Sequence, residues 1–337
     1  MSIRTELRRI VEDRATLSRG EATTLMQRIL ASEVPEMELA ALLGAMAGRG
    51  ETAAEIAGFA QTLRALATPL PLSDEERATI VDTCGTGGDG SGTFNISTAA
   101  ALVAAAAGAQ VAKHGNRAIT SRCGSADVLD ALGIPTELPP DAAADALRKT
   151  GFCFLLAPAH HPAMKTLMPI RRALGVRTVL HVLGPLLNPA GVKRQVMGVY
   201  AGRLVAPVAQ AMVLLGTTHG IVVHGHQGLD ELSLSGPSDV AVVHDESVRL
   251  DTVAPDALQL AKAPVAALAG GDAQANAAIL RAIFTGERGP RRDVVLLNAA
   301  AVLVVAGLAK NLPDGIARAA ETIDSGSVVR LIVRLQR

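Results

Sequence analysis

Residues 84–98 read Cys84-Gly85-Thr86-Gly87-Gly88-Asp89-Gly90-Ser91-Gly92-Thr93-Phe94-Asn95-Ile96-Ser97-Thr98. A short β-rich run at 80–83 precedes this segment, and an alanine-rich helical pattern at 99–107 follows it. Its five glycines let the backbone turn N–H groups inward and approach a ligand closely, while the helix behind them adds positive potential at its N-terminus. The segment therefore predicts an anion-binding loop, which in open α/β sheets lies at the carboxyl ends of strands.

This glycine-rich loop, residues 84–98, admits other readings. Residues 85–90 satisfy the GxGxxG pattern of dinucleotide-binding folds, but the next strand ends in Lys113 and His114 instead of the acidic residue that holds a ribose hydroxyl. No GK[ST] follows, so the loop is not a Walker A motif. A purely structural turn, with Ser97 and Thr98 acting as helix caps, is a further alternative, and capping is compatible with phosphate binding.

The rest of the chain predicts an α/β fold with a helical N-terminal part. Six β-rich runs predict a mostly parallel, covered sheet, and they lie at 80–83, 110–112, 152–156, 195–200, 220–223 and 240–243. Before them, the capping pairs Ser18/Glu21 and Thr52/Glu55 begin two helices, and a third begins near Pro35. A proline-containing linker at 68–73 separates the two patterns, and helices return from 272 onward, including an apolar one at 294–309.

Composition excludes several classes of protein. The 337 residues carry 32 basic and 32 acidic side chains, and with five Phe, one Tyr and no Trp we expect no nucleic-acid partner. The longest uncharged run, 90–112, contains polar residues and is read as loop plus buried helix, so no membrane span is expected. The charged N-terminus and three cysteines without CxxC spacing predict a cytoplasmic protein with reduced thiols.

A basic segment follows the second predicted strand. Residues 113–117 read Lys-His-Gly-Asn-Arg, and they lie beside the glycine-rich loop if the first two strands are neighbours. Ser121, Gly124 and Ser125 then lead into a predicted helix at 127–132, whose N-terminus can accept a second anion. Two anion sites indicate a ligand phosphorylated at both ends.

Asp230 and Glu231 are adjacent carboxylates in a predicted loop after the strand at 220–223. Mg²⁺ binds through one or two carboxylates together with substrate phosphates and waters. A solvated acidic turn is the alternative when such a pair is taken alone. The predicted phosphate site nearby favours the metal site.

Two other polar features lie between the third and fourth predicted strands. Arg171, at the basic end of a predicted helix at 162–175, can offer a bidentate fork to a carboxylate, although an arginine on a helix is more often a surface residue. His160 and His161 are adjacent, so their side chains point apart, and Pro162 suggests a helix start. We therefore expect no zinc site.

Seven motifs, in order along the chain, resemble those of the anthranilate phosphoribosyltransferase family. They are GTGGDG at Gly85, FNIST at Phe94, KHGNR at Lys113, GSAD at Gly124, HPAMK at His161, GPLLNP at Gly184 and GLDE at Gly228. The segments around 270–272, Asn276 and Asn298 also look alike, so the resemblance covers nearly the whole chain. Two positions depart from the family pattern: Thr120 replaces a frequent Ser, and Leu180-His181 replaces the usual Phe-Asn.

The resemblance implies a helical domain (1–72, joined in space by about 162–180) and an α/β domain (73–337) of the nucleoside phosphorylase and phosphoribosyltransferase type, in a homodimer. It implies that phosphoribosyl diphosphate is bound by Gly85, Gly88, Asp89, Thr93, Asn95, Ile96, Ser97, Thr98, Lys113, Ser121 and Ser125. It implies that anthranilate is bound by Gly85, His114, Asn116, His161 and Arg171, with Arg171 facing its carboxylate. It also implies that Mg²⁺ is held by Ser97, Asp230 and Glu231.

The implied reaction belongs to tryptophan biosynthesis and joins the phosphoribosyl group of phosphoribosyl diphosphate to the amine of anthranilate, releasing pyrophosphate. No residue is assigned as a general acid or base, because the amine loses its proton readily once it is bonded to carbon. A pyrimidine nucleoside phosphorylase is the alternative enzyme, although its basic loop usually reads Lys-x-Ser-Gly-Arg. A non-catalytic regulator that binds a nucleic acid or a metabolite is the other alternative.

Overall fold

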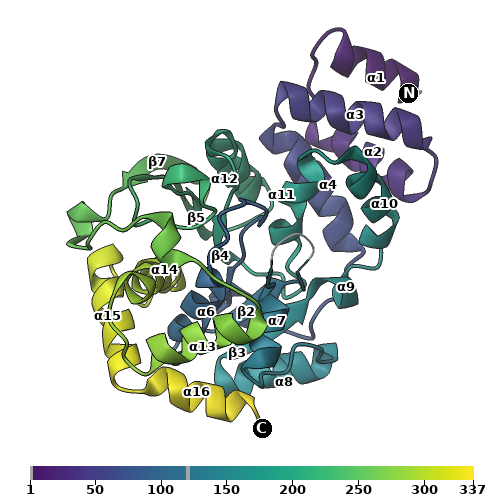
Figure 1. Ribbon diagram of the computed structural model, residues 1–337. Coiled ribbons are helices and arrows are strands. Elements are labelled where there is room, and N and C mark those ends of the chain that lie inside the picture. Colours follow the sequence, from purple (N-terminus) through teal and green to yellow (C-terminus); the bar gives the residue numbers. More distant parts are fainter. Residues whose placement is uncertain (1–2, 119–121) are drawn as a thin grey trace.

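The computed structural model describes residues 3–118 and 122–337, and a small helical bundle projects from a larger α/β body (Figure 1). The N-terminal helices of the bundle are α1 (Ile3–Val11), α2 (Arg19–Leu30), α3 (Glu36–Arg49) and α4 (Ala53–Ala65). Both predicted capping boxes are present, because Ser18 and Thr52 each cap a helix reciprocally with the glutamate three positions on. Helix α1 is an addition to the three helices that the sequence predicts.

The body is built on a seven-stranded sheet in the order β3-β2-β1-β4-β5-β6-β7. The strands are β1 (Val81–Thr83), β2 (Val111–Gly115), β3 (Phe152–Leu156), β4 (Arg194–Gly198), β5 (His219–His224), β6 (Ser238–His244) and β7 (Ser247–Val253). Strands β1 to β5 are parallel to one another, β6 is antiparallel to β5, and β7 is antiparallel to β6. The predicted mostly parallel sheet is confirmed, and β7 is an additional strand at one edge.

Helices cover both faces of this sheet. On one face, α6 (Ile96–Ala106) and α14 (Pro290–Ala306) pack together over Val81, Val111 and Val196 in one hydrophobic cluster. On the other face, α12 (Val205–Leu214) covers β5 and β6, and α8 (Pro140–Thr150) covers β3. The other helices of the body are α5 (Asp74–Thr79), α7 (Ser125–Ala131), α13 (Ala273–Phe284), α15 (Leu312–Asp324) and α16 (Ser327–Leu335), with short 3-10 turns at Gly184–Leu187, Gly202–Leu204, His226–Gly228, Asp256–Leu258 and Val265–Leu268.

The chain returns to the helical bundle after β3 (Figure 1). Helix α9 (Ala157–His160) leads into α10 (Met164–Leu174) and α11 (Val179–Leu183). Leu167 and Ile170 of α10 belong to the same hydrophobic cluster as residues of α2, α3 and α4. The Thr68 N–H, in the non-helical linker, donates to the His160 carbonyl (2.9 Å), so two connections between bundle and body lie side by side.

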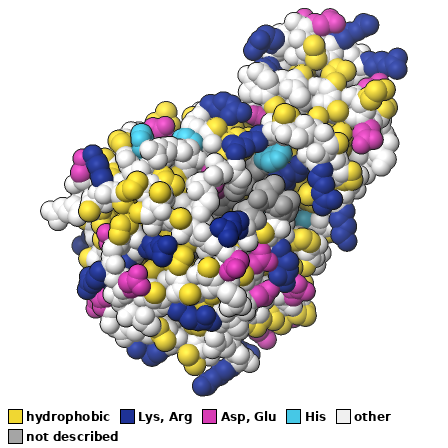
Figure 2. All heavy atoms as spheres, viewed as in Figure 1, with side chains coloured by type: hydrophobic (Ala, Val, Ile, Leu, Met, Phe, Trp, Pro, Cys, Tyr) yellow, Lys and Arg dark blue, Asp and Glu magenta, His cyan; other side chains and the backbone are white. Residues whose placement is uncertain are grey.

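The surface carries both signs of charge. Figure 2 shows Lys and Arg side chains spread over the bundle and the body, with Asp and Glu side chains between them. Within residues 3–118 and 122–337, no helix combines the length and the apolar character needed to cross a bilayer.

Candidate active site

The glycine-rich loop begins where the order of the strands reverses. Strand β1 has β2 on one side and β4 on the other, so the chain leaves β1 at a topological switch point, where α/β sheets bind ligands. The loop continues the pairing with β4, because the Cys84 N–H donates to the Val196 carbonyl (3.2 Å) and the Thr86 N–H to the Gly198 carbonyl (2.9 Å). The predicted position of the loop is confirmed.

The loop is shaped by glycines and by one carboxylate. Four of its glycines, at 87, 88, 90 and 92, have φ between 65° and 74°, a left-handed region that favours glycine. The Asp89 carboxylate accepts hydrogen bonds from the N–H (3.0 Å) and Oγ (2.9 Å) of Ser91. Helix α6 begins at Ile96, so Ser97 and Thr98 lie in its first turn, and the alternative that they act as N-caps is wrong.

The two carboxylates predicted to bind metal reach this loop. Asp230 Oδ2 accepts from the Gly87 N–H (2.7 Å), and Glu231 Oε1 accepts from the Ser97 N–H at the start of α6 (3.1 Å). Burial raises the pKa of both carboxyl groups, and the neighbouring charges of Asp89 and Asp230 raise it further. The charged forms of Asp230 and Glu231, the acidic pair, are therefore disfavoured in this environment, and a bound cation would stabilise them.

Glycines allow the Asp230 segment to come this close. A Cβ on Gly198, at the end of β4, would overlap the Asp230 carbonyl oxygen, and a Cβ on Gly85 would lie 2.5 Å from Asp230 Oδ2. Since real Cβ contacts do not reach such distances, position 198 requires glycine for this packing, and a Cβ at Gly85 would displace the Asp230 carboxylate. The acidic pair thus packs closely against the carboxyl ends of β1 and β4.

Lys113 and His114 lie inside β2 and not in a loop after it, which corrects the predicted end of that strand. The Lys113 side chain is 2% exposed, and its Nζ donates to the Thr83 carbonyl (2.5 Å) and to Ser97 Oγ (3.4 Å). The His114 N–H donates to the carboxylate of buried Asp82 (3.1 Å), whose pKa burial raises to about 6. The Lys113 ammonium and the His114 N–H therefore have partners inside the protein, so the strand continues through two residues that the sequence suggests are solvated.

The residues beside the loop fit Mg²⁺. The acidic pair supplies hard oxygen donors, and Ser97 Oγ is held nearby by Lys113. Among the described residues, no three His, Cys, Asp or Glu side chains cluster in a way that could hold a metal ion. This donor set suits Mg²⁺, which is usually bound by one or two carboxylates plus substrate phosphates, and not a closed protein cage.

The second predicted anion site, at the start of α7, differs from expectation. Helix α7 has seven residues, and the Asp127 carboxylate accepts from the Gly124 N–H (2.8 Å) and the Ala118 N–H (2.9 Å). The N-terminus therefore already faces a carboxylate of its own chain. Ser125 Oγ donates to the Asn116 carbonyl (3.3 Å), whereas Ser121 and the departure at Thr120 lie outside the described residues.

Two histidines predicted to bind the acceptor meet at the buried end of β2. The His114 and His161 rings lie edge to face, with centroids 5.1 Å apart, and the residues are 2% and 4% exposed. Among the described residues, no hydrogen-bond partner reaches any of their four ring nitrogens. Burial lowers the pKa of both imidazoles, that of His161 to about 4, so both rings are neutral near pH 7 and leave donors and acceptors for a ligand.

The helices that return to the bundle supply the remaining acceptor residue. Arg171 Nε of α10 lies 3.3 Å from His181 Nε2, so the departure at His181 touches the predicted carboxylate partner directly. Burial and Arg171 lower the pKa of His181 to about 4. Arg177, between α10 and α11, donates to the Gly88 carbonyl and lies over the Tyr200 ring, which joins this segment to the glycine-rich loop. His160 Nδ1 instead donates to the Thr68 carbonyl (2.9 Å).

Two buried asparagines near the site were not assigned a role from the sequence. Asn276 Nδ2 of α13 donates to Asn95 Oδ1 (2.9 Å), and Asn95 Nδ2 donates to the Cys123 carbonyl (3.2 Å), so the Asn95 amide is engaged by protein on both sides. Asn298 of α14 bonds the backbone of Leu232, next to the acidic pair. An amide in the middle of an apolar helix was the signal that could have identified Asn298.

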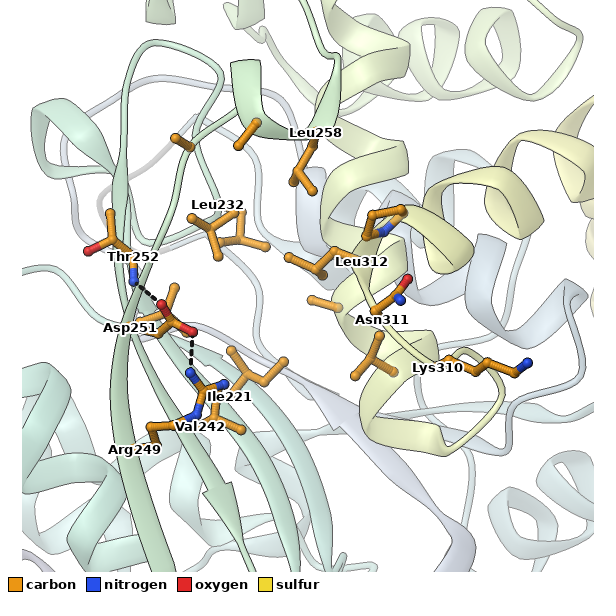
Figure 3. A pocket seen from close by; sticks show the side chains of 17 residues that line it. Ile221, Leu232, Val242, Arg249, Asp251, Thr252, Leu258, Lys310, Asn311 and Leu312 are labelled. Atoms are coloured by element: carbon orange, nitrogen blue, oxygen red, sulfur yellow. Dashed lines mark hydrogen bonds and ion pairs between the residues drawn. The ribbon is translucent and has the colours of Figure 1, made fainter.

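A cavity of about 410 Å³ lies elsewhere, between β6, β7 and the helices α14 and α15 (Figure 3). Its lining includes Leu232, Leu258 and Leu312, and the ion pair between Arg249 and Asp251 (2.5 Å) lies on its β7 side. None of the predicted site residues lines this cavity. This cavity is therefore separate from the site described above.

Comparisons with known proteins agree with this geometry. Residues 77–329 match the family model "Glycosyl transferase family, a/b domain", and residues 5–67 match "Glycosyl transferase family, helical bundle domain". Anthranilate phosphoribosyltransferase of Moorella thermoacetica is 50% identical over 92% of this chain and 91% of that protein. The crystal structure of anthranilate phosphoribosyltransferase from Thermus thermophilus is 43% identical, with a TM-score of 0.90 over 98% of each chain.

The enzyme from Saccharomyces cerevisiae is a more distant structural relative. Its complex with PRPP (phosphoribosyl diphosphate) and Mg is 28% identical, with a TM-score of 0.87 over 99% of this chain and 96% of that one. Its complex with 4-fluoroanthranilate is 27% identical, with a TM-score of 0.86 over the same shares of the two chains. On the strength of these matches and of the loops built at the switch point, the chain belongs to the anthranilate phosphoribosyltransferase family.

Proposed function

We propose that this chain transfers the phosphoribosyl group of phosphoribosyl diphosphate to the amine of anthranilate. The bond from ribose C1 to the diphosphate oxygen breaks, a bond from C1 to the amine nitrogen forms, pyrophosphate leaves, and the amine proton goes to solvent. One observation carries the proposal: a glycine-rich loop with paired carboxylates on its N–H groups lies one strand away from two buried, unpartnered imidazoles. Pyrophosphate needs the first environment, and an aromatic amine suits the second.

The donor side comprises the residues that would hold phosphoribosyl diphosphate. These are Gly85, Gly88, Asp89, Thr93, Asn95, Ile96, Ser97, Thr98, Lys113, Ser121 and Ser125. The positive-φ glycines and the first turn of α6 support this assignment, because backbone N–H groups at a helix N-terminus favour phosphate. The engaged amide of Asn95 suggests that it shapes the loop while its backbone meets the ligand.

Mg²⁺ would be held by Ser97, Asp230 and Glu231 together with diphosphate oxygens. The ion supplies neutralisation of the charge that develops on the leaving pyrophosphate. Lys113 adds a buried ammonium beside Ser97, and the loop N–H groups add fixed dipoles. Stabilisation of the leaving group is thus the main contribution of this half of the site.

The acceptor side comprises Gly85, His114, Asn116, His161 and Arg171, which would receive anthranilate. Arg171 carries a half-buried guanidinium that can pair with the carboxylate of the acceptor. The neutral, buried rings of His114 and His161 support this assignment, because their ring faces and nitrogens can contact an aromatic amine. These groups orient the amine toward C1 and need not take up a proton.

The proposal extends to the organisation of the protein. We assign 1–72, with about 162–180, to a helical domain and 73–337 to an α/β domain, which the packing of α10 against α3 supports. A homodimer is part of the proposal, because the resemblance to the family implies it. A cytoplasmic location is supported by the three cysteines, which are present as thiols. Sedimentation velocity and cell fractionation test these two points.

Pyrophosphate release with and without anthranilate tests the reaction. We expect release only when phosphoribosyl diphosphate, Mg²⁺ and anthranilate are all present. Phosphorolysis of thymidine or uridine without Mg²⁺ would contradict the proposal and favour a nucleoside phosphorylase. Ligand binding without turnover in any mixture would favour a regulatory protein.

A further inference from the structure

Asn298 is a buried amide in the middle of an apolar helix. It is 3% exposed in α14, and its neighbours Leu297 and Ala299 are fully buried. Asparagine has a low helix propensity, and burial of an amide is unfavourable unless its donors and acceptor are satisfied. Its place in this helix therefore requires strong local hydrogen bonding.

Asn298 uses its amide to hold the backbone of one residue in another element. Its Oδ1 accepts from the Leu232 N–H (2.9 Å), and its Nδ2 donates to the Leu232 carbonyl (3.0 Å) and to the Val294 carbonyl (2.9 Å). Both backbone groups of Leu232 are satisfied by one side chain, as they would be by a neighbouring strand. The Leu232 side chain is itself 1% exposed, so this point of the loop is fixed from two sides.

Leu232 directly follows the acidic pair. In front of the pair, Asp230 and Glu231 accept from N–H groups of the glycine-rich loop and of α6. Behind the pair, Asn298 ties the chain to α14, and α14 packs directly against α6. The two carboxylates are therefore held between two elements whose separation is set by a helix packing contact.

We propose that Asn298 is a positioning residue that sets the place of the acidic pair relative to Ser97 and Lys113, and through it the affinity of the site for Mg²⁺ and phosphoribosyl diphosphate together. This inference rests on the proposed function. Mg²⁺ demands near-ideal octahedral geometry, so a displaced carboxylate weakens its binding even where the fold is intact. The Asn298 amide bonds the backbone of Leu232 and Val294, so its effect on the acidic pair passes through Leu232.

The test compares variants in the Mg²⁺ dependence of ligand binding. Asn298→Ala removes all three hydrogen bonds, and Asn298→Leu removes them while retaining most of the side-chain volume. Leu303→Ala, at a fully buried position of the same helix, is the matched control for lost stability. Calorimetric titration with phosphoribosyl diphosphate at a series of Mg²⁺ concentrations, without anthranilate, measures the half-saturating Mg²⁺ concentration, and thermal unfolding measures stability.

We expect both Asn298 variants to raise the half-saturating Mg²⁺ concentration about tenfold, equivalent to about 1.4 kcal/mol, and excess Mg²⁺ to restore binding. Leu303→Ala should lower the melting temperature but leave the Mg²⁺ dependence within about twofold of wild type. Folded Asn298 variants with a lower melting temperature and an unchanged Mg²⁺ dependence would overturn the inference. A wild-type protein that binds no phosphoribosyl diphosphate in Mg²⁺ would instead overturn the proposed function.

Discussion

The donor and acceptor sides differ in how their polar groups are satisfied. On the donor side, the two carboxylates accept from loop N–H groups, and Lys113 donates to the Thr83 carbonyl and to Ser97 Oγ. On the acceptor side, the His114 and His161 ring nitrogens are buried with no hydrogen-bond partner among the described residues. The donor side is built by adjoining strands of one sheet, whereas the acceptor side combines β2 with the helices that return to the bundle.

This difference indicates which half is preformed. Interlocked backbone and carboxylate groups need little reorganisation to receive a phosphorylated ligand, because the ligand and its cation replace contacts of similar geometry. Buried nitrogens without a strong hydrogen bond are costly, and a bound acceptor would lower this cost by supplying a partner. We therefore expect donor binding to be independent of the acceptor.

The largest expected effect comes from the acidic pair. Asp230→Asn combined with Glu231→Gln removes both charges at nearly constant volume, so kcat/KM for phosphoribosyl diphosphate should fall about 10³-fold and its Mg²⁺ dependence should flatten. Steady-state kinetics at varied Mg²⁺ concentration measure this. An unchanged metal titration in the double variant would remove the pair from the donor side.

A second test disturbs the packing of β4 against the acidic pair without changing any charge. Gly198→Ala places a methyl group where the Asp230 carbonyl lies, so the segment must shift, and we expect the KM for phosphoribosyl diphosphate to rise roughly 10- to 100-fold. Gly44→Ala, in α3 with open space around it, is the control and should be neutral or slightly stabilising. Equal behaviour of the two variants would show that the close approach has no role.

The acceptor side should respond separately. Arg171→Ala removes the proposed charged partner of the acceptor carboxylate, so the KM for anthranilate should rise about 10-fold while binding of phosphoribosyl diphosphate is retained. The exposed neighbour Arg172→Ala serves as control. Losses of similar size for both substrates would contradict the separation of the two sides.

The last expected effect concerns stability at mildly acidic pH and not ligand binding. The folded-state pKa of His161 is about 4, below its unfolded value of about 6.5, so between these values the unfolded chain binds a proton that the folded chain excludes. The free energy of unfolding therefore falls as pH drops from 6.5 toward 4. The loss of stability at pH 5 is at most about 2 kcal/mol.

Urea unfolding at pH 7.5 and pH 5 measures this contribution. His161→Asn cannot take up a proton, so it should lose less stability than wild type between the two pH values. The exposed His226→Asn should behave as wild type. An identical loss in wild type and His161→Asn would show that His161 is not buried in its neutral form.

Local sequence patterns predicted much of the fold. Contacts between elements that are distant in the sequence explain most of the features that these patterns did not predict. Ser18 and Thr52 located helix starts because capping chemistry lies within four residues. The predicted end of β2 was wrong because Lys113 and His114 are polar and were read as solvated. In the structure, Lys113 Nζ bonds the Thr83 carbonyl and the His114 N–H bonds Asp82, and these contacts with a neighbouring strand cannot be predicted from local periodicity. Strand β7 was missed because its side chains are mostly exposed at a sheet edge.

The same reasoning applies to the site. The glycine-rich loop and the acidic pair were predicted separately, and the structure brings them together through Gly87 and Ser97. The supporting groups Gly198 and Asn298 could not be paired with Asp230 and Leu232 from sequence spacing, because each contact depends on how distant elements pack. Motifs thus located the glycine-rich loop and the acidic pair, but not the distant residues that hold them in place.

Calorimetric titration of the wild-type protein with phosphoribosyl diphosphate, with no anthranilate, tests most directly whether the donor side is preformed. The account predicts saturable binding that requires Mg²⁺ and whose affinity changes little when anthranilate is added. Binding that appears only with anthranilate present, or that is as tight without Mg²⁺, would contradict it.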